Sequence, residues 1–239
     1  MRLYVYCLSD EPGAAPSEGL EGVGGARVRL FESGGLSVVV SDFEGERAPI
    51  TREGLRAHNR VNAHVLARVT PLPFRFGTLA DEGRLNSYVE SNARALREAL
   101  ARVRGRVEMS VKVRLGPDAE VDARAEKETA APEVRAGARG SGTAFLLAKR
   151  REMMGEESLK ARAEEAAARL ASTVGALARE SDVRLTPEGP IVVRASHLVG
   201  RADVAEYRAR LREAGARAGG MLLLLSGPWP PYSFGVTRV

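Results

Sequence analysis

The sequence predicts an α+β protein with two domains and a short C-terminal tail. Three observations support this prediction: strand-like apolar alternation at both ends of the chain, amphipathic helical stretches between them, and a stretch poor in apolar residues near the middle. We expect an N-terminal α+β domain over residues 1–104. A ferredoxin-like domain is expected over residues 105–226, with an insert at 117–142, followed by a proline- and aromatic-rich tail at 227–239.

The N-terminal half begins with a strand over residues 2–9, in which apolar side chains occupy both faces, so we expect it to be central in its sheet. Strands are predicted at 26–31 and 36–41, and Gly34 and Gly35 between them favour a hairpin. A helix should begin after Thr51 and end before Pro71, with Leu55, His58 and Val61 on its apolar side. A second helix is predicted over 82–103, ended by Gly105.

The C-terminal half starts with a strand at 106–116, where Val107, Met109, Val111 and Val113 alternate with the polar series that begins at Glu108. A long helix is predicted over 143–180. Strands are then expected at 183–185 and 191–198, a helix from Asp203 to about residue 216, and a last strand at 221–226. This order of strand, helix, strand, strand, helix, strand is the split βαβ pattern, and a long first helix is its unusual feature.

The insert at 117–142 collects Ala, Glu, Arg, Gly and Pro, and it has too few apolar residues to offset the entropy of ordering. We therefore expect it to be a mobile or partly helical segment that folding does not require. The tail has the opposite character, because three prolines stand among Trp229, Tyr232 and Phe234. These prolines predict an extended segment that leaves the sheet after residue 226, and its aromatic side chains should dock, with residues 71–76 as the nearest receptor.

Composition bounds the possible functions. Cys7 is the only cysteine, so an intramolecular disulfide and a Cys-rich metal site are excluded, and a buried thiol in a reducing cytosol is expected. No secretory signal is recognisable, and no apolar run, including that at 221–225, approaches the ~20 residues of a membrane span. We expect no membrane association.

Catalytic and metal-binding patterns are weak. His58 and His64 are six residues apart, so they point to different sides of their helix, and His197 is expected as a half-buried surface side chain. The glycine-rich stretches at 22–25 and 137–142 lack the spacing of a phosphate loop. No nucleophile elbow or catalytic pair is recognisable. We therefore expect a protein that is not an enzyme and that uses no cofactor and no metal.

The formal charge of +5 leaves a second function class open. A basic ferredoxin-like module could bind RNA, since basic surfaces attract phosphate. However, the arginines lie among glutamates along helical faces, and strands 107–113 and 221–225 contain no aromatic residue on which bases could stack. No nucleic-acid partner is expected, and the RNA-binding module remains the alternative.

Two segments differ from ordinary fold-building sequence: TPLPFRFGT at 70–78 and GPWPPYSF at 227–234. They resemble segments of the gas vesicle F/L proteins. Four further parts of the chain share this resemblance: the N-terminal strand, the helix that carries His58, the segment with Glu108, Val111 and Lys112, and the run at 142–150. The resemblance covers nearly the whole chain outside the insert.

The resemblance implies a minor structural component or assembly factor of gas vesicles, the gas-filled protein shells that give some microbes buoyancy. It also implies localisation to the gas vesicle, and binding to the small hydrophobic shell protein and to other gas vesicle accessory proteins, with restraint of shell protein aggregation during nucleation. The candidate packing or partner contacts are the two aromatic groups: Phe74 and Phe76, and Trp229, Tyr232 and Phe234.

Overall fold

The computed structural model describes residues 1–115, 141–186, 191–217 and 221–235, and for 141–156 it describes the backbone only. The chain forms two compact units. The first contains Met1–Met109, His197–Val204 and Gly227–Val239, and the second contains Ser110–Ser196 and Ala205–Ser226. Residues 197–204 and the tail thus belong to the same unit as the N-terminal half.

The first unit has a five-stranded sheet with β1 (Arg2–Ser9) at its centre. β1 pairs antiparallel with β3 (Leu36–Phe43) on one side, and with the short strands β4 (Leu72–Pro73) and β5 (Leu79–Ala80) on the other. β2 (Val28–Ser33) completes the predicted hairpin with β3, and Gly34 and Gly35 adopt positive φ in the turn. The two short strands were not predicted, since a two-residue strand leaves no periodic signal.

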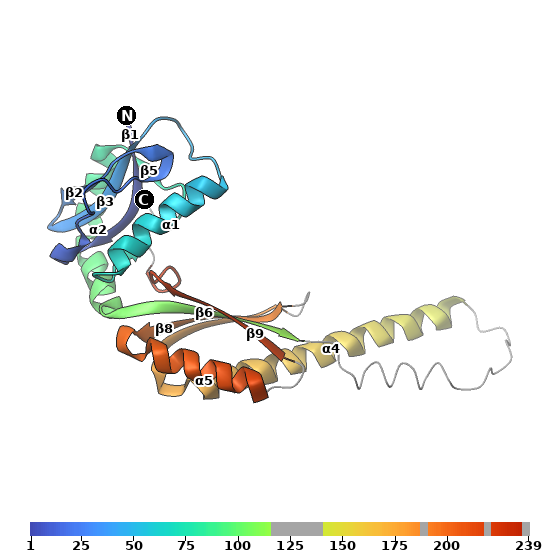
Figure 1. Cartoon of the computed structure of the whole chain (residues 1–239). Coiled ribbons are helices and arrows are strands. Elements are labelled where there is room, and N and C mark those ends of the chain that lie inside the picture. The colour runs from blue at the N-terminus through green and yellow to red at the C-terminus, as the bar shows by residue number, and fades with distance from the viewer. Residues whose placement is uncertain (116–140, 187–190, 218–220, 236–239) are drawn as a thin grey trace. The chain divides into compact units, whose positions relative to one another are not determined.

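Helices α1 (Arg52–Leu66) and α2 (Glu82–Val103) lie on opposite faces of this sheet (Figure 1). Leu3, Val5 and Leu8 of β1 pack in the cluster that contains the α2 residues. Tyr4, Tyr6 and Cys7 pack in the cluster that contains the α1 residues. Strict alternation would place Cys7 with Val5, but a register shift between these two residues turns Cys7 to the α1 side.

Both helix starts follow from capping. The Thr51 side chain accepts a hydrogen bond from the Gly54 backbone N–H, and the Asp81 side chain accepts one from that of Arg84. The prediction for Leu55 was wrong, because this residue is 38% exposed instead of packing on the apolar side of α1. Short 3₁₀ turns at Pro12–Ala14 and Val23–Gly25 complete the described secondary structure of the N-terminal half.

The second sheet has four strands in the order β7-β8-β6-β9. They are β6 (Arg106–Leu115), β7 (Ala178–Leu185), β8 (Ile191–Gly200) and β9 (Met221–Trp229). Helices α4 (Ser141–Val174) and α5 (Val204–Arg217) lie on the same side of this sheet (Figure 1), and the 3₁₀ turns Gly175–Leu177 and Arg201–Asp203 flank them. Val111, Val113, Leu170 and Leu211 are among the buried residues of the second unit.

The three largest differences from the predicted boundaries concern α4, β7 and β9. α4 ends at Val174 and not near residue 180, because Gly175 takes a φ of 49° that ends the helix, and β7 begins at Ala178. β9 continues to Trp229 instead of ending at residue 226, so the prolines do not end it where expected. Pro228 is tolerated because β9 is an edge strand, where a missing N–H breaks no interior ladder.

Two further expectations concern the insert and His197. The insert predicted at 117–142 lies outside the described residues, apart from the two that open α4. His197 was expected half-buried at the surface, but it is 1% exposed. The reason is that the last part of β8 belongs to the first unit, where the adjacent Leu198 joins the buried cluster of that unit.

Candidate functional site

The C-terminal segment lies in the first unit and contacts residues far away in the sequence. Phe234 is 6% exposed and packs in the apolar cluster that contains Leu72 and Phe74. Two polar side chains hold the residues before it: His58 on α1 contacts Tyr232, and Glu108 on β6 contacts Ser233. We call His58, Leu72, Phe74 and Glu108 the tail socket.

His58 is the polar centre of the tail socket. Its Nδ1 atom lies 3.1 Å from the Tyr4 hydroxyl oxygen, and its Nε2 atom lies 3.0 Å from the Tyr232 hydroxyl oxygen. A neutral imidazole offers one donor and one acceptor, and tyrosine hydroxyls can take either role. The side chain is 2% exposed, and this burial lowers the pKa of His58 to about 4. At neutral pH His58 is therefore uncharged and joins β1 to the tail.

Glu108 accepts two hydrogen bonds from the tail. Its Oε2 atom accepts from the Ser233 backbone N–H at 2.7 Å, and its Oε1 atom accepts from the Ser233 hydroxyl at 2.8 Å. The residue is 6% exposed although the strand pattern placed it on the polar face of β6. The prediction of an outward Glu108 was wrong, because the tail returns over that position and buries it.

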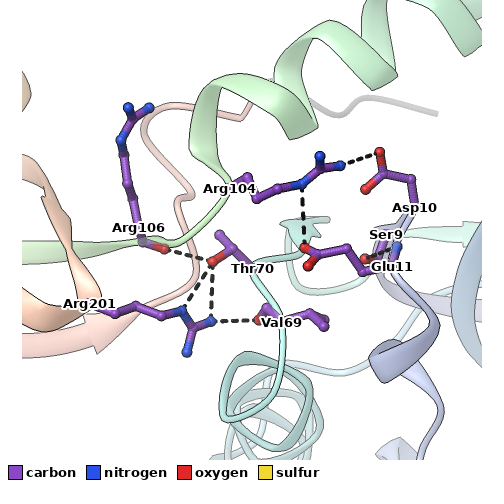
Figure 2. A network of polar contacts seen from close by, with 8 residues as sticks. All are labelled: Ser9, Asp10, Glu11, Val69, Thr70, Arg104, Arg106 and Arg201. Atoms are coloured by element: carbon purple, nitrogen blue, oxygen red, sulfur yellow. Dashed lines mark hydrogen bonds and ion pairs between the residues drawn. The ribbon is translucent and has the colours of Figure 1, made fainter.

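A polar network in the same unit joins β6 to the end of the segment after α1 (Figure 2). The Thr70 hydroxyl donates to the Arg106 carbonyl oxygen at 2.9 Å. The Arg201 guanidinium donates to the Val69 carbonyl oxygen at 2.7 Å and to Thr70 Oγ1 at 3.1 Å. Burial lowers the pKa of Arg201, while the charge of Glu11 opposes this change. Nearby, Arg104 pairs with Asp10 at 2.6 Å in a more exposed position (Figure 2).

The five aromatic residues named from the sequence have different environments. Phe74 is fully buried and Phe234 nearly so, and they share one apolar cluster. Phe76 is partly buried and meets His58 edge-on, with ring centroids 5.7 Å apart. Tyr232 contacts His58, whereas Trp229 stays 39% exposed at the end of β9. The structure therefore joins four of the five in or beside the tail socket.

The sequence reasoning did not find the roles of Glu108, Thr70 and Arg201. Each is an ordinary polar residue on a strand, in a turn or before a helix, and its partner is more than 30 positions away. The one available signal was the proline-rich tail, whose docking implies that some buried polar group must satisfy its backbone.

A cavity of about 930 Å³ lies at the start of α1. The glycine-rich turn at 22–25, which the sequence did not favour as a phosphate loop, lines one part of it. Three arginines and three glutamates line it, so their formal charges cancel and the cavity offers no net attraction for an anion. The charged residues are Arg52, Arg56, Arg60, Glu21, Glu44 and Glu53.

Within the described residues, no three His, Cys, Asp or Glu side chains are grouped as a metal site would require. The same described residues contain no helix that is long and apolar enough to cross a membrane. The tail socket itself holds two titratable groups, and both are engaged by the tail. Its chemistry is that of a structural contact.

Comparison with known proteins assigns the family. The model of the gas vesicle synthesis protein GvpL/GvpF family matches residues 2–235. Gas vesicle protein L of Streptomyces sp. (strain CB03234) is 29% identical over 253 aligned positions, covering 97% of this chain and 91% of that protein. Gas vesicle protein F of the same strain is 28% identical, covering 98% and 99%.

The fold has a solved counterpart. The crystal structure of the gas vesicle protein GvpF from Anabaena sp. PCC7120 matches with a TM-score of 0.80 at 19% identity, covering 100% of this chain and 99% of that one. It supports the mixed α+β fold with two sheets. Since the family match extends over nearly the whole sequence, the chain belongs to the gas vesicle synthesis protein GvpL/GvpF family.

Proposed function

We propose that this chain is a minor structural component or assembly factor of gas vesicles. In this role it binds the small hydrophobic shell protein and limits its aggregation during vesicle nucleation. The observation that carries the proposal is the family match over residues 2–235. Localisation at the gas vesicle and contact with other gas vesicle accessory proteins follow from the same proposal.

The described surface supports a binding role. Several large apolar side chains remain substantially exposed, although most others in the described residues are packed in cores. Such groups can cover the apolar surface of a partner and so slow its self-association. The exposed set includes Leu222, Leu224 and Trp229 of β9, together with Val183, Leu185, Ile50 and Leu55.

We also propose that the second unit is a ferredoxin-like domain. Support comes from its element order, in which α4 joins β6 to β7 and α5 joins β8 to β9, and from the spatial strand order β7-β8-β6-β9. This arrangement leaves one sheet face without α4 and α5, and it leaves β7 and β9 at the two edges.

Co-expression with the shell protein tests the proposed function. The tagged chain should retain the shell protein in a pull-down, and added chain should delay the rise of light scattering when the shell protein is diluted out of denaturant. An unrelated protein of similar size and charge serves as the control. Absence of both retention and delay would overturn the proposal.

A further inference from the structure

The two edges of the second sheet differ sharply in composition. β7 presents four charged residues among its eight, and charges on an edge strand discourage pairing with another chain. The first five residues of β9, Met221–Leu225, carry no charge at all. Charges thus protect one edge of the sheet against added strands, whereas residues 221–225 of the other edge carry none.

The side chains of β9 are apolar on both faces. Leu222 and Leu224 are 44% and 43% exposed on one face. On the other face Leu223 lies next to α5, since a Cβ added to Gly215 would be 3.6 Å from a Leu223 methyl carbon. A strand added at this edge would therefore meet apolar groups above and below its own plane.

A groove adjoins the helix-facing side of β9. It has a volume of about 250 Å³ and lies between α4 and α5. This is smaller than the roughly 300–1,000 Å³ of small-molecule sites, so it suits single side chains better than a cofactor. Its lining is mostly apolar or small, with two arginines: Ala166, Arg169, Leu170, Ser172, Thr173, Leu211, Ala214, Arg217, Met221 and Leu223.

We propose that the β9 edge, residues 221–225, is a docking site for an extended segment of a partner protein. The segment adds to the sheet as a fifth strand next to β9. Its backbone pairs with the edge of β9 that faces away from β6, and because strand side chains alternate, every second one enters the groove between α4 and α5 while the others cover Leu222 and Leu224. Aliphatic residues at alternate positions are the sequence that this site selects.

The charges around the groove indicate which kind of partner segment binds there. α5 carries four arginines against two glutamates, and Arg169 and Arg217 line the groove. Both groove arginines are paired with glutamates one helical turn away in exposed positions, so they can exchange partners at little cost. An apolar segment flanked by acidic residues complements this surface, whereas a second copy of this chain would bring the same arginines together.

This inference rests on the proposed function, since the shell protein is the partner expected to supply the segment. The test therefore uses the shell protein and a set of overlapping synthetic peptides that cover its sequence. The full chain is compared with the double variant Leu222→Lys/Leu224→Lys and with Ala214→Leu, which narrows the groove. The matched control is Val183→Lys on β7, because Val183 has the same 43% exposure as Leu224 but lies on the opposite edge.

The double variant should bind the shell protein and its best peptide at least about tenfold more weakly, a loss of ~1.4 kcal/mol, and Val183→Lys should bind normally. Ala214→Leu should weaken the binding of peptides with large aliphatic residues more than the binding of other peptides. Amide hydrogen exchange within 221–225 should slow when the peptide binds. Melting curves confirm that each variant is folded, and any that is not is replaced by the Leu224→Lys single variant.

The outcomes separate the two proposals. Equal binding by the double variant and the unaltered chain, or unchanged exchange at 221–225, overturns the docking site and leaves the proposed function standing. No binding by the unaltered chain overturns both. A dimer of this chain that forms with rising concentration and that the double variant abolishes would show that the edge pairs with a second copy. That result contradicts docking of a partner segment flanked by acidic residues.

Discussion

The Tyr232 hydroxyl lies 3.0 Å from Nε2 of His58, although 174 positions separate the two residues in the sequence. This contact, the two hydrogen bonds between Glu108 and Ser233, and the burial of Phe234 fix the C-terminal segment within the first unit. Phe234 is therefore part of the core of that unit, and the contacts of residues 232–234 lead to measurable consequences.

Phe234 should be the main apolar anchor of the tail. Phe234→Ala should lower the free energy of unfolding by about 3–5 kcal/mol, the usual loss when a buried phenylalanine is truncated. Trp229→Ala is the matched control, and it should cost far less because Trp229 is 39% exposed, against 6% for Phe234. Urea denaturation measures both. Equal losses would show that Phe234 does not anchor the tail.

Stability should fall in mild acid because of buried histidines. Burial lowers the pKa of both His58 and His197 to about 4, below the ordinary value of 6.5. The unfolded chain therefore takes up these protons first, so the stabilisation is complete above pH 6.5 and is lost as the pH falls from 6.5 to about 4. The slope is up to about 1.4 kcal/mol per pH unit for each histidine.

Urea midpoints between pH 4 and 7 test this dependence. The His58→Gln and His197→Gln variants should each show a shallower decline than the unaltered chain. His64→Gln should change the slope much less, because His64 is more exposed than either. An unchanged slope in His58→Gln would contradict the assignment of a buried neutral imidazole at this position.

Glu108 should matter more to stability than the strand pattern suggests. Glu108→Ala leaves the Ser233 backbone N–H without its acceptor, at a cost of about 1–3 kcal/mol. Ser233→Ala removes the hydroxyl bond to Glu108 and keeps the backbone bond to it, and it should cost about 0.5–1.5 kcal/mol. A double-mutant cycle measures the coupling between the two residues. Strictly additive losses would mean that the pair does not interact in solution.

Arg201 should not be replaceable by lysine. The substitution Arg201→Lys loses the planar fork that donates to the Val69 carbonyl and to Thr70 Oγ1, so unfolding should become easier by about 1–3 kcal/mol. The control Arg104→Lys changes an ion pair whose arginine is half exposed, and it should destabilise the protein much less than Arg201→Lys does. Thermal unfolding compares them, and similar losses would refute the special role of Arg201.

The insert at 117–142 stays a prediction from composition. Its deletion should leave the melting temperature nearly unchanged, because the segment offers few apolar anchors. Differential scanning calorimetry of the deleted and full chains measures this. A decrease of more than a few degrees would show that the insert packs on the folded part.

The sequence by itself determined most of the longer helices and strands, and the resemblance that pointed to the family, but it gave no sign of β4 and β5. Alternation located β1, β6 and β8, helical spacing located α1 and α2, and Thr51 and Gly105 marked helix ends, because these signals lie within a few residues of what they specify. The resemblance at 70–78 and 227–234 led to the gas vesicle family that the comparisons then showed. The candidate aromatic residues were likewise recognisable in the sequence, because they stand among prolines in these two segments.

Only the tertiary structure decided which polar residues matter. Glu108 follows the polar phase of its strand, His197 was expected near the surface, and Arg201 carries no local signal, yet all three are buried or engaged in the first unit. The extension of β9 past Pro228 also depended on its position at an edge. The physical reason is that burial and pairing depend on segments far away in the sequence, about which local periodicity carries no information. Ser233 lies 125 positions from Glu108, and Val69 lies 132 positions from Arg201.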